Sequence, residues 1–277
     1  MKQRAFGLKN LIYLPLILFS LLMLYPLFWM LISSLKVNTE IMSSAWSLPR
    51  LPQWGNYVQV WLQGRFLQYF ANSIGVSAVS ILLILGVSSL AAYGFARYDF
   101  RFRKSLFYYS LIGQMIPIHA TLIPLYTMFR TTGLLDTYGA MILANTAFGL
   151  SFAIFLLRAY FLDVPREIEE AARLDGCSEW GIFWRVFLPI SKSAMATVLI
   201  YQFIWTWNMF LFPLIFVTKE SLKTLPLGLM SFNGEWGDVN WSMMFTALNV
   251  ATLPMIAVLL IFQRQFIKGI TAGAVKG

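Results

Sequence analysis

The residues of this sequence that could form specific ionic contacts are concentrated in one short segment. Six acids and five bases fall between Arg158 and Lys192, whereas long apolar runs make up most of the chain around them. Carboxylates and guanidinium groups at helical spacing pair with each other or with opposite charges on a partner surface. The chemistry that this charged segment offers is therefore ion pairing.

The sequence lacks the common signatures of catalysis and of metal binding. It contains no Cys-x-x-Cys pair, no Gly-x-x-x-x-Gly-Lys-Ser/Thr phosphate loop, no His-Glu-x-x-His and no Gly-x-Ser-x-Gly. Cys177 is the single cysteine, so no disulfide can form within the chain. We therefore expect no catalytic residue, no metal site and no cofactor.

The first half of the charged segment has the pattern of a capped helix. Asp163 is expected as the N-cap, with Pro165 two residues later, where a missing N–H costs little. Glu169 and Glu170 follow near the positive end of the helix dipole, and Ala171–Ala172 favours helix and leaves a smooth surface.

The second half of the segment predicts a turn and a second helix. Gly176 suits a left-handed helix stop, and Asp175 before it tolerates a turn. Ser178 can cap the next helix, and Pro189 is expected to mark the entry to the following apolar run. The segment is thus predicted to be a helix–turn–helix.

Composition places these elements in an integral membrane protein. Of the 277 residues, 58% are hydrophobic and 12% are charged, and the mean hydropathy is +0.68. Soluble chains usually carry about twice that charged fraction. The net charge of +9 does not indicate nucleic acid binding, because the bases are spread between apolar runs and form no single stripe or tail.

Six uncharged runs are long enough to cross a bilayer, which takes about 20 residues. They predict an all-α membrane domain that covers residues 1–277, with six transmembrane helices and the charged segment 158–192 between the fourth and fifth. The runs are Leu11–Leu35, Phe66–Ala96, Ser105–Phe129, Thr137–Leu157, Ser193–Val217 and Val239–Gln263.

Lysine and arginine counts predict the orientation of these spans. With the N-terminus inside, the inner segments carry more than twice as many of these residues as the outer ones. Both termini and the charged segment are therefore expected in the cytoplasm, with an uncleaved first span. The basic residues of the two terminal segments are Lys2, Arg4, Lys9, Arg264, Lys268 and Lys276.

The outer segment 36–65 carries Trp46, Trp54 and Trp61. These tryptophans fit an interfacial aromatic belt, where indole rings prefer to lie. A docking surface for an external partner is the alternative interpretation.

The spacing within the charged segment resembles the "EAA" loop of ABC importer permeases. Glu170-Ala171-Ala172 is followed at the family's intervals by Gly176 and by the closing hydrophobic positions. The chain departs from the family at two places. Val186 stands where the family has isoleucine, and a proline that many members have near Ser193 is missing here. The missing proline leaves the entry angle of the fifth span open. The matching or adjacent residues are Glu169, Glu170, Ala171, Ala172, Asp175, Gly176, Val186, Leu188 and Pro189.

Other stretches extend the resemblance over nearly the whole chain, in the order typical of carbohydrate-uptake permeases. They are Tyr25–Lys36, Ala91–Phe100, Ile123–Tyr138, Trp207–Leu214 and Gly269–Gly277. The resemblance implies a non-catalytic subunit of a bacterial inner-membrane importer, with a carbohydrate as substrate. It also implies a second permease, two copies of an ATPase that receives the charged segment as a coupling helix, and an extracytoplasmic solute-binding protein.

Polar residues within the spans are candidates for the substrate path. His119 is the single histidine and lies between two prolines, and three other spans carry one candidate asparagine each. Helix–helix hydrogen bonds are the alternative role. Trp205 and Trp207 are more typical of packing than of sugar stacking. The three asparagines are Asn145, Asn208 and Asn249.

Two other function classes fit the sequence poorly. An ion-coupled secondary transporter would be expected to hold ionisable groups within the bilayer, and the six runs contain no Asp, Glu, Lys or Arg. An intramembrane protease would need one of the missing catalytic signatures. The sequence does not identify the sugar or the partner subunits.

Overall fold

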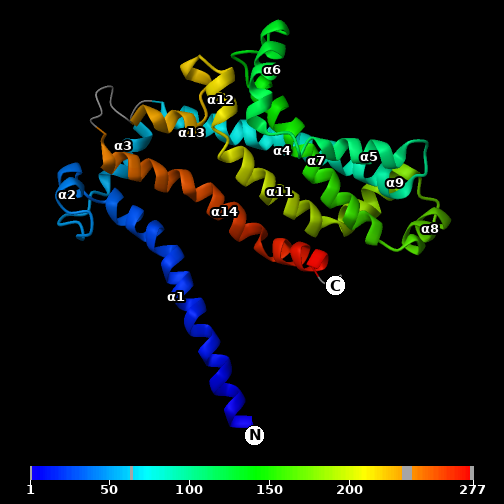
Figure 1. The fold of residues 1–277 in the computed structure, drawn as a ribbon, viewed down its shortest axis with the longest axis horizontal. Coiled ribbons are helices and arrows are strands. Elements are labelled where there is room, and N and C mark those ends of the chain that lie inside the picture. The colour runs from blue at the N-terminus through cyan, green and yellow to red at the C-terminus, as the bar shows by residue number, and fades with distance from the viewer. Residues whose placement is uncertain (1, 63–64, 233–238, 275–277) are drawn as a thin grey trace. The chain divides into compact units, whose positions relative to one another are not determined.

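The computed structural model describes the backbone of residues 2–62, 65–232 and 239–274, and side chains within 13–62, 65–230, 232 and 239–265. Within these ranges the chain is helical and contains no strand. The side chains of Lys2, Arg4, Lys9, Lys268 and Lys276, on which the predicted orientation partly depends, lie outside the described residues. The α-helices in the first half are α1 (Lys2–Ser34), α2 (Asn38–Ser43), α3 (Gly55–Leu62), α4 (Phe66–Arg97), α5 (Arg103–Ile112), α6 (Ile118–Thr131) and α7 (Tyr138–Asp163) (Figure 1).

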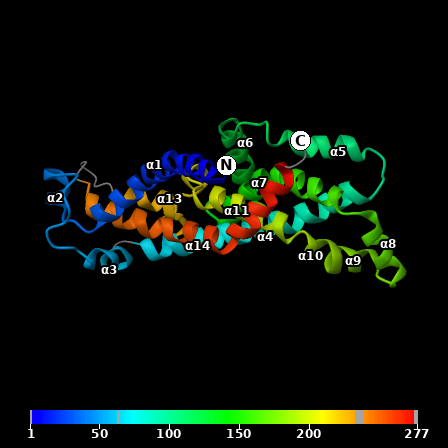
Figure 2. The same cartoon turned by 90° about the horizontal axis from the view of Figure 1, so that it is seen from below.

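The second half begins with short helices. They follow one another at one end of a compact unit made of residues 68–227 and 254–277 (Figures 1 and 2). These helices are α8 (Arg166–Leu174), α9 (Glu179–Ile182), the π-helix η1 (Phe183–Phe187) and α10 (Leu188–Ile190). The remaining elements are α11 (Lys192–Trp207), α12 (Leu211–Phe216), α13 (Leu225–Gly228), α14 (Trp241–Ala274) and the 3₁₀ turns η2 (Glu220–Leu222) and η3 (Leu229–Phe232).

The chain forms two compact units. Residues 1–67 and 228–253 make the first unit, and residues 68–227 and 254–277 make the second. Each unit therefore combines two segments that are far apart in the sequence.

Hydrogen bonds from polar side chains join the segments of the first unit. Asn249 donates its side-chain amide to the carbonyl of Met30 at 3.1 Å, and Asn56 donates to the carbonyl of Ser34 at 2.8 Å. Trp29 packs edge-on against Phe245 with ring centroids 5.0 Å apart. Asn249 thus makes a hydrogen bond between helices, the alternative role expected for it.

In the second unit, α7 packs against α5, α11 and α12 (Figure 1). One apolar cluster joins the end of α4 to α7, η1 and α11, and includes Ala92, Leu157, Phe187 and Val198, all fully or almost fully buried. α7 can pack on several sides because small residues such as Ala144 and Gly149 let neighbouring helices approach closely.

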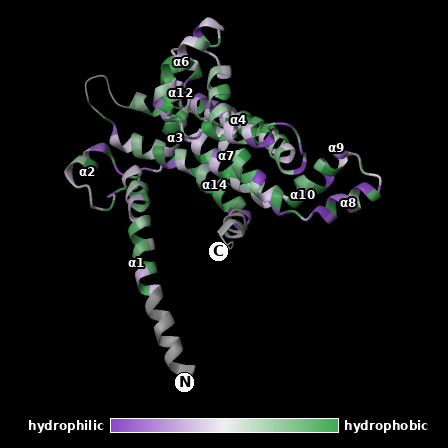
Figure 3. Cartoon of the chain, turned by 45° about the vertical axis from the view of Figure 1, so that its right-hand side comes forward, coloured by the Kyte–Doolittle hydropathy of each residue, from purple (hydrophilic) through white to green (hydrophobic). Residues whose placement is uncertain are grey.

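Four helices are long and apolar enough to cross a membrane: α4, α7 and the described parts of α1 and α14. Figure 3 shows hydrophobic residues along these helices and hydrophilic residues concentrated in α8. A bent pair, residues 179–190 with α11, would make a fifth span. The number six remains a prediction.

Two of the predicted runs are not single helices. Ser105–Phe129 is interrupted between Ile112 and Ile118, because Pro117 lacks an N–H and keeps the residue before it out of helical geometry. Ser193–Val217 is interrupted after Trp207, and Pro213 lies in the first turn of the next helix, where it cannot continue a hydrogen-bond ladder from α11.

A polar clasp joins two loops of the second unit. The carboxylate of Asp136 accepts hydrogen bonds from the backbone N–H of Thr218 at 2.5 Å, from its hydroxyl at 2.7 Å and from the N–H of Lys219 at 3.0 Å. These hydrogen bonds lower the pKa of Asp136 below its ordinary value of 3.8. Asp136 also has a φ of 56°, a left-handed conformation that aspartate tolerates better than most residues.

We expect Asp136→Asn to lower stability at neutral pH by on the order of 1 kcal/mol, because Thr218 and Lys219 are exposed and their donors can turn to water. The charged carboxylate is the form that the clasp stabilises, so its contribution is present above the ordinary pKa and is lost as pH falls through the lowered one. Thermal unfolding of Asp136→Asn and wild-type protein between pH 7 and pH 3 tests this. Their stabilities should converge toward acid pH, and a difference that does not change with pH would contradict the assignment.

Candidate functional site

The charged loop, residues 164–191, begins where α7 ends. Asp163 is the last residue of α7 and not the N-cap of the next helix, so that part of the prediction is wrong. The helix continues because Phe161 is fully buried in the apolar cluster. Val164 then takes an extended conformation before Pro165, and α8 starts at Arg166.

The predicted turn of the charged loop is confirmed. Gly176 has a φ of 80°, and the N–H of Cys177 bonds back to the carbonyl of Ala172. The Ser178 hydroxyl accepts the N–H of Gly181 at 3.1 Å and caps α9. The sequence signals in this turn were local, which is why they could be read without the fold.

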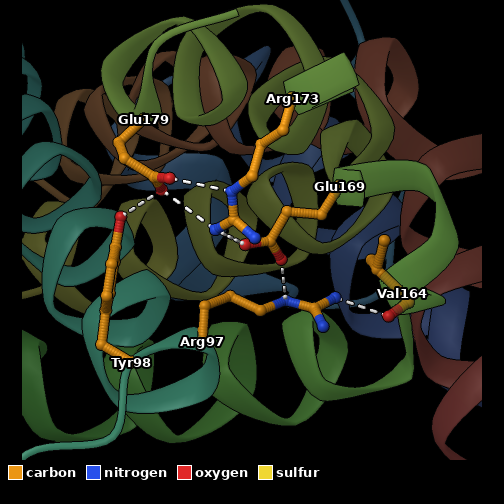
Figure 4. A network of polar contacts seen from close by, with 6 residues as sticks. All are labelled: Arg97, Tyr98, Val164, Glu169, Arg173 and Glu179. Atoms are coloured by element: carbon orange, nitrogen blue, oxygen red, sulfur yellow. Dashed lines mark hydrogen bonds and ion pairs between the residues drawn. The ribbon is translucent and has the colours of Figure 1, made fainter. Parts of the chain in front are cut away.

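A buried arginine from α4 holds the charged loop. The Arg97 side chain is 4% exposed, and its Nε lies 3.6 Å from a carboxylate oxygen of Glu169, whose side chain is 7% exposed (Figure 4). Arg97 donates to the Val164 carbonyl at 2.5 Å and lies over the Phe187 ring at 4.7 Å. The Nε of Arg97 makes no hydrogen bond, so its contact with Glu169 is ionic.

A second arginine continues this network to α9. Arg173 donates to Glu169 at 2.6 Å and to Glu179 at 2.9 Å, and the Tyr98 hydroxyl donates to Glu179 at 2.7 Å (Figure 4). Hydrogen bonds from Arg173 and Tyr98 lower the pKa of Glu179 below its ordinary value of 4.5. The network therefore ties both helices of the loop to the end of α4 at neutral pH.

The apolar side of the charged loop packs against the rest of the second unit. Ala172 is buried in the cluster formed with α4, α7 and α11, and Val186 and Leu188 pack against the same cluster. Glu169, Ala172, Val186 and Leu188 thus serve inward contacts, although the sequence grouped them with the residues expected to meet a partner.

The other side of the charged loop is exposed. Glu170, Ala171, Asp175, Gly176 and Pro189, from the same predicted set, lie there. Three large apolar side chains share the exposure: Leu174 at 90%, Trp180 at 63% and Trp184 at 59%. The sequence analysis did not single out these three residues. Apolar residues inside a charged segment were the signal that could have identified them.

The loop returns to α11 through a sharp bend. Residues 179–190 and Lys192–Trp207 meet at 72°, with Ser191 at the junction. Pro189, expected to mark the entry to the next span, lies in α10, two residues before this junction. The π-helix η1 precedes it, and such local widening of a helix is common at functional positions.

The predicted path residues come from different elements and differ in burial. His119 is exposed on α6, and Asn145 is buried in α7 with its side-chain oxygen unpaired. Asn208 ends α11 and donates to the Ile204 carbonyl at 2.8 Å, and its amide lies 3.7 Å from the Met255 sulfur. Asn249 belongs to the other unit.

A cavity of about 280 Å³ lies instead beside the break between α5 and α6. Its walls come from the break itself, from α7 and from α11, and include Gln114, Phe152, Tyr201, Gln202 and Trp205. The sequence did not single out these glutamines.

Residues 84–272 match the family model "Binding-protein-dependent transport system inner membrane component". The match covers more than half of the chain and includes the charged loop, the α5–α6 break and the cavity. The chain belongs to this permease family.

Named relatives agree with this family over almost the full length of the permease. It is 38% identical to the probable ABC transporter permease protein YurM of Bacillus subtilis, over 96% of this chain and 88% of that protein. This chain is 36% identical to the arabinooligosaccharides transport system permease protein AraQ of Bacillus subtilis, over 93% of this chain and 92% of that protein. The trehalose/maltose transport system permease protein MalG of Thermococcus litoralis is 30% identical, over 97% of each.

A solved structure agrees with the fold. A chain of a bacterial ABC transporter involved in the import of alginate superposes with a TM-score of 0.82 and 23% identity, covering 96% of the permease and 98% of that chain. At this identity the likeness concerns the fold. The all-helical permease architecture predicted from the sequence is therefore confirmed.

We expect the Arg97–Glu169 pair to be a major determinant of the loop's position. Replacing Arg97 with Met leaves Glu169 buried with one partner fewer, which should lower stability by about 3 kcal/mol, whereas Arg97→Met with Glu169→Met should cost less than the sum of the single changes. Thermal unfolding in detergent measures both quantities.

The control is Arg103→Met, because its ion-pair partner Asp99 is 81% exposed and the pair should contribute less than about 1 kcal/mol. Equal losses for Arg97 and Arg103, with additive double variants, would show that the buried pair has no special role.

Proposed function

We propose that this permease forms half of the translocation path of an ATP-driven importer for oligosaccharides. The support is the family, the saccharide transport named for several relatives, and an uncharged cavity lined by aromatic and amide side chains. Its substrate class thus follows the relatives and the chemistry of the cavity walls.

Within this proposal the permease works with four other subunits. A second permease completes the path, two copies of an ATPase supply the energy, and an extracytoplasmic solute-binding protein delivers the saccharide. The family description names the dependence on a binding protein. The sequence has no phosphate-binding loop, which fits a subunit that is not an enzyme and receives its energy from partners.

The exposed side of the charged loop is the proposed ATPase-docking surface. The observation that carries this assignment is the division of the loop into two faces: one held by the buried Arg97–Glu169 pair, the other presenting Glu170 and Leu174 to solvent. Because the inner face of the loop is held rigidly, a displacement of its outer face by the ATPase would move α4 and α11 together as one rigid body. The exposed apolar side chains of the loop have acidic residues beside them, and such a surface suits a cleft with basic walls on the ATPase.

Docking to an ATPase places the charged loop in the cytoplasm, together with both termini. It follows that the clasp at Asp136 and Thr218 faces the outside. The ion-coupled transporter, the main rival, gains no support from His119, which is exposed on α6 and not enclosed among charged groups.

Single-cysteine labelling tests this orientation. In a Cys177→Ser background, a cysteine at exposed Asp175 should react with an impermeant maleimide only from the cytoplasmic side, and a cysteine at exposed Lys219 only from outside. Both sites are open to solvent in the permease without its partners, so the labelling uses permease expressed without the ATPase, whose docking would cover Asp175. Reaction of both from the same side would refute the proposed topology.

Glu170→Lys and Gly176→Val should abolish coupling while leaving the permease in the membrane. The first reverses a charge at a close contact, and the second forces a β-branched residue into a left-handed backbone, at about 1–2 kcal/mol. A Cβ at Gly176 meets no atom within 4 Å, so the strain is confined to the backbone.

The measurements are ATPase co-purification through a tag on this chain, and uptake of maltose, trehalose, cellobiose, diacetylchitobiose and arabinotriose by cells that carry each variant. Wild-type cells should take up at least one of these sugars, and both variants should lose uptake and retained ATPase. Asp99→Lys, a charge reversal at an exposed acid between α4 and α5 and outside the charged loop, is the control. Unchanged uptake by Glu170→Lys and Gly176→Val would refute the docking surface.

A further inference from the structure

The cavity beside the α5–α6 break owes its shape to an interruption of the helix and to a facing residue without a side chain. Pro117 ends the preceding turn, so the backbone from Gly113 to Ile116 passes beside α7 without forming a helix. On the facing helix, Gly149 has no side chain, and a Cβ there would lie 2.4 Å from Ile84 and 2.8 Å from the Gln202 side-chain oxygen. Any larger residue at 149 would displace Gln202.

Gln202 brings an unpaired acceptor to the cavity wall. The residue is 1% exposed, and its amide nitrogen donates to the Gly149 carbonyl at 3.1 Å. Its side-chain oxygen has no hydrogen-bond partner. An unsatisfied buried acceptor is unfavourable for folding, and a donor from a water or a ligand in the cavity would satisfy this one.

Aromatic rings form the wall around this acceptor. Tyr201 and Phe152 are stacked with centroids 4.1 Å apart, and Trp205 lies one helical turn beyond Tyr201. Gln114 adds a second amide from the break. The lining contains no Asp, Glu, Lys, Arg or His, so the site offers ring faces and neutral hydrogen-bonding groups.

We propose that this cavity is a saccharide subsite within the permease itself, in which Gln202 accepts a hydrogen bond from a sugar hydroxyl while the C–H face of the ring packs on Tyr201 or Trp205. The inference rests on the proposed transport function and adds which residues of this subunit touch the substrate. A neutral polyol supplies both the donor and the apolar face that the walls require. A lipid chain would leave the Gln202 oxygen unpaired.

The volume sets the size of the bound part. About 280 Å³ is near the lower end of ligand pockets, which suits one sugar ring of a longer chain. The two exposed rings, Tyr201 and Trp205, leave the cavity open on one side, so that an oligosaccharide can extend beyond it. The subsite therefore selects a ring, not a length.

The test uses the whole importer in cells, with uptake of the five sugars named above measured against concentration. Gln202→Met keeps the length of the side chain and removes the unpaired oxygen together with the amide that donates to the Gly149 carbonyl. That carbonyl lies within α7 and keeps its helical hydrogen bond, so abundance should change little. The KM for the transported sugar should rise about threefold to tenfold, with a smaller change in maximal rate. Gln114→Met, at a more exposed wall position, is the second variant and should raise the KM as well.

Tyr109→Leu is the matched control, because Tyr109 is an exposed aromatic residue of α5 outside the cavity lining and should leave the KM unchanged. Wild-type uptake with an unaltered KM in Gln202→Met and Gln114→Met would overturn the subsite and leave the proposed function standing. If wild-type cells import none of the five sugars, the proposed function fails, and the subsite fails with it.

Discussion

The end of α4 carries a guanidinium group with almost no access to water, and the arrangement of the charged loop follows from that constraint. Arg97 can stay charged there only with an anion and a carbonyl beside it, and Glu169 and Val164 provide them. Both come from the loop and not from α4. Moving the loop away would leave the arginine buried without its counter-ion, so α4, α8 and η1 are held as one body.

This constraint separates neighbouring acids that look equivalent in the sequence. Glu169 and Glu170 are adjacent in the chain, yet one is buried against Arg97 and the other is exposed. The choice between them depends on an arginine more than seventy positions earlier, and spacing within the loop could not reveal it. Gly176 and Ser178 were predictable because a left-handed turn and a helix cap depend on their nearest neighbours alone.

The apolar runs had a similar limit. Hydropathy found the long helices α1, α4, α7 and α14, where composition alone determines the length of a span. It could not detect the interruptions near Pro117 and after Trp207, because the residues around them remain apolar. The cavity was missed for the same reason: Gln202 stands in an apolar run as an isolated amide, and only the absence of a side chain at Gly149 gives it room.

The helix α1 differs from the others in how little of it the chain covers. Only 6% of its most apolar stretch is buried within the protein, against 56% for α7. Its conformation is therefore stabilised by whatever surrounds it, whether acyl chains or another subunit, and contributes little to the packing of the rest. During extraction from the membrane, the choice of detergent will then govern the state of α1, while the packing around α7 depends mainly on the chain's own contacts.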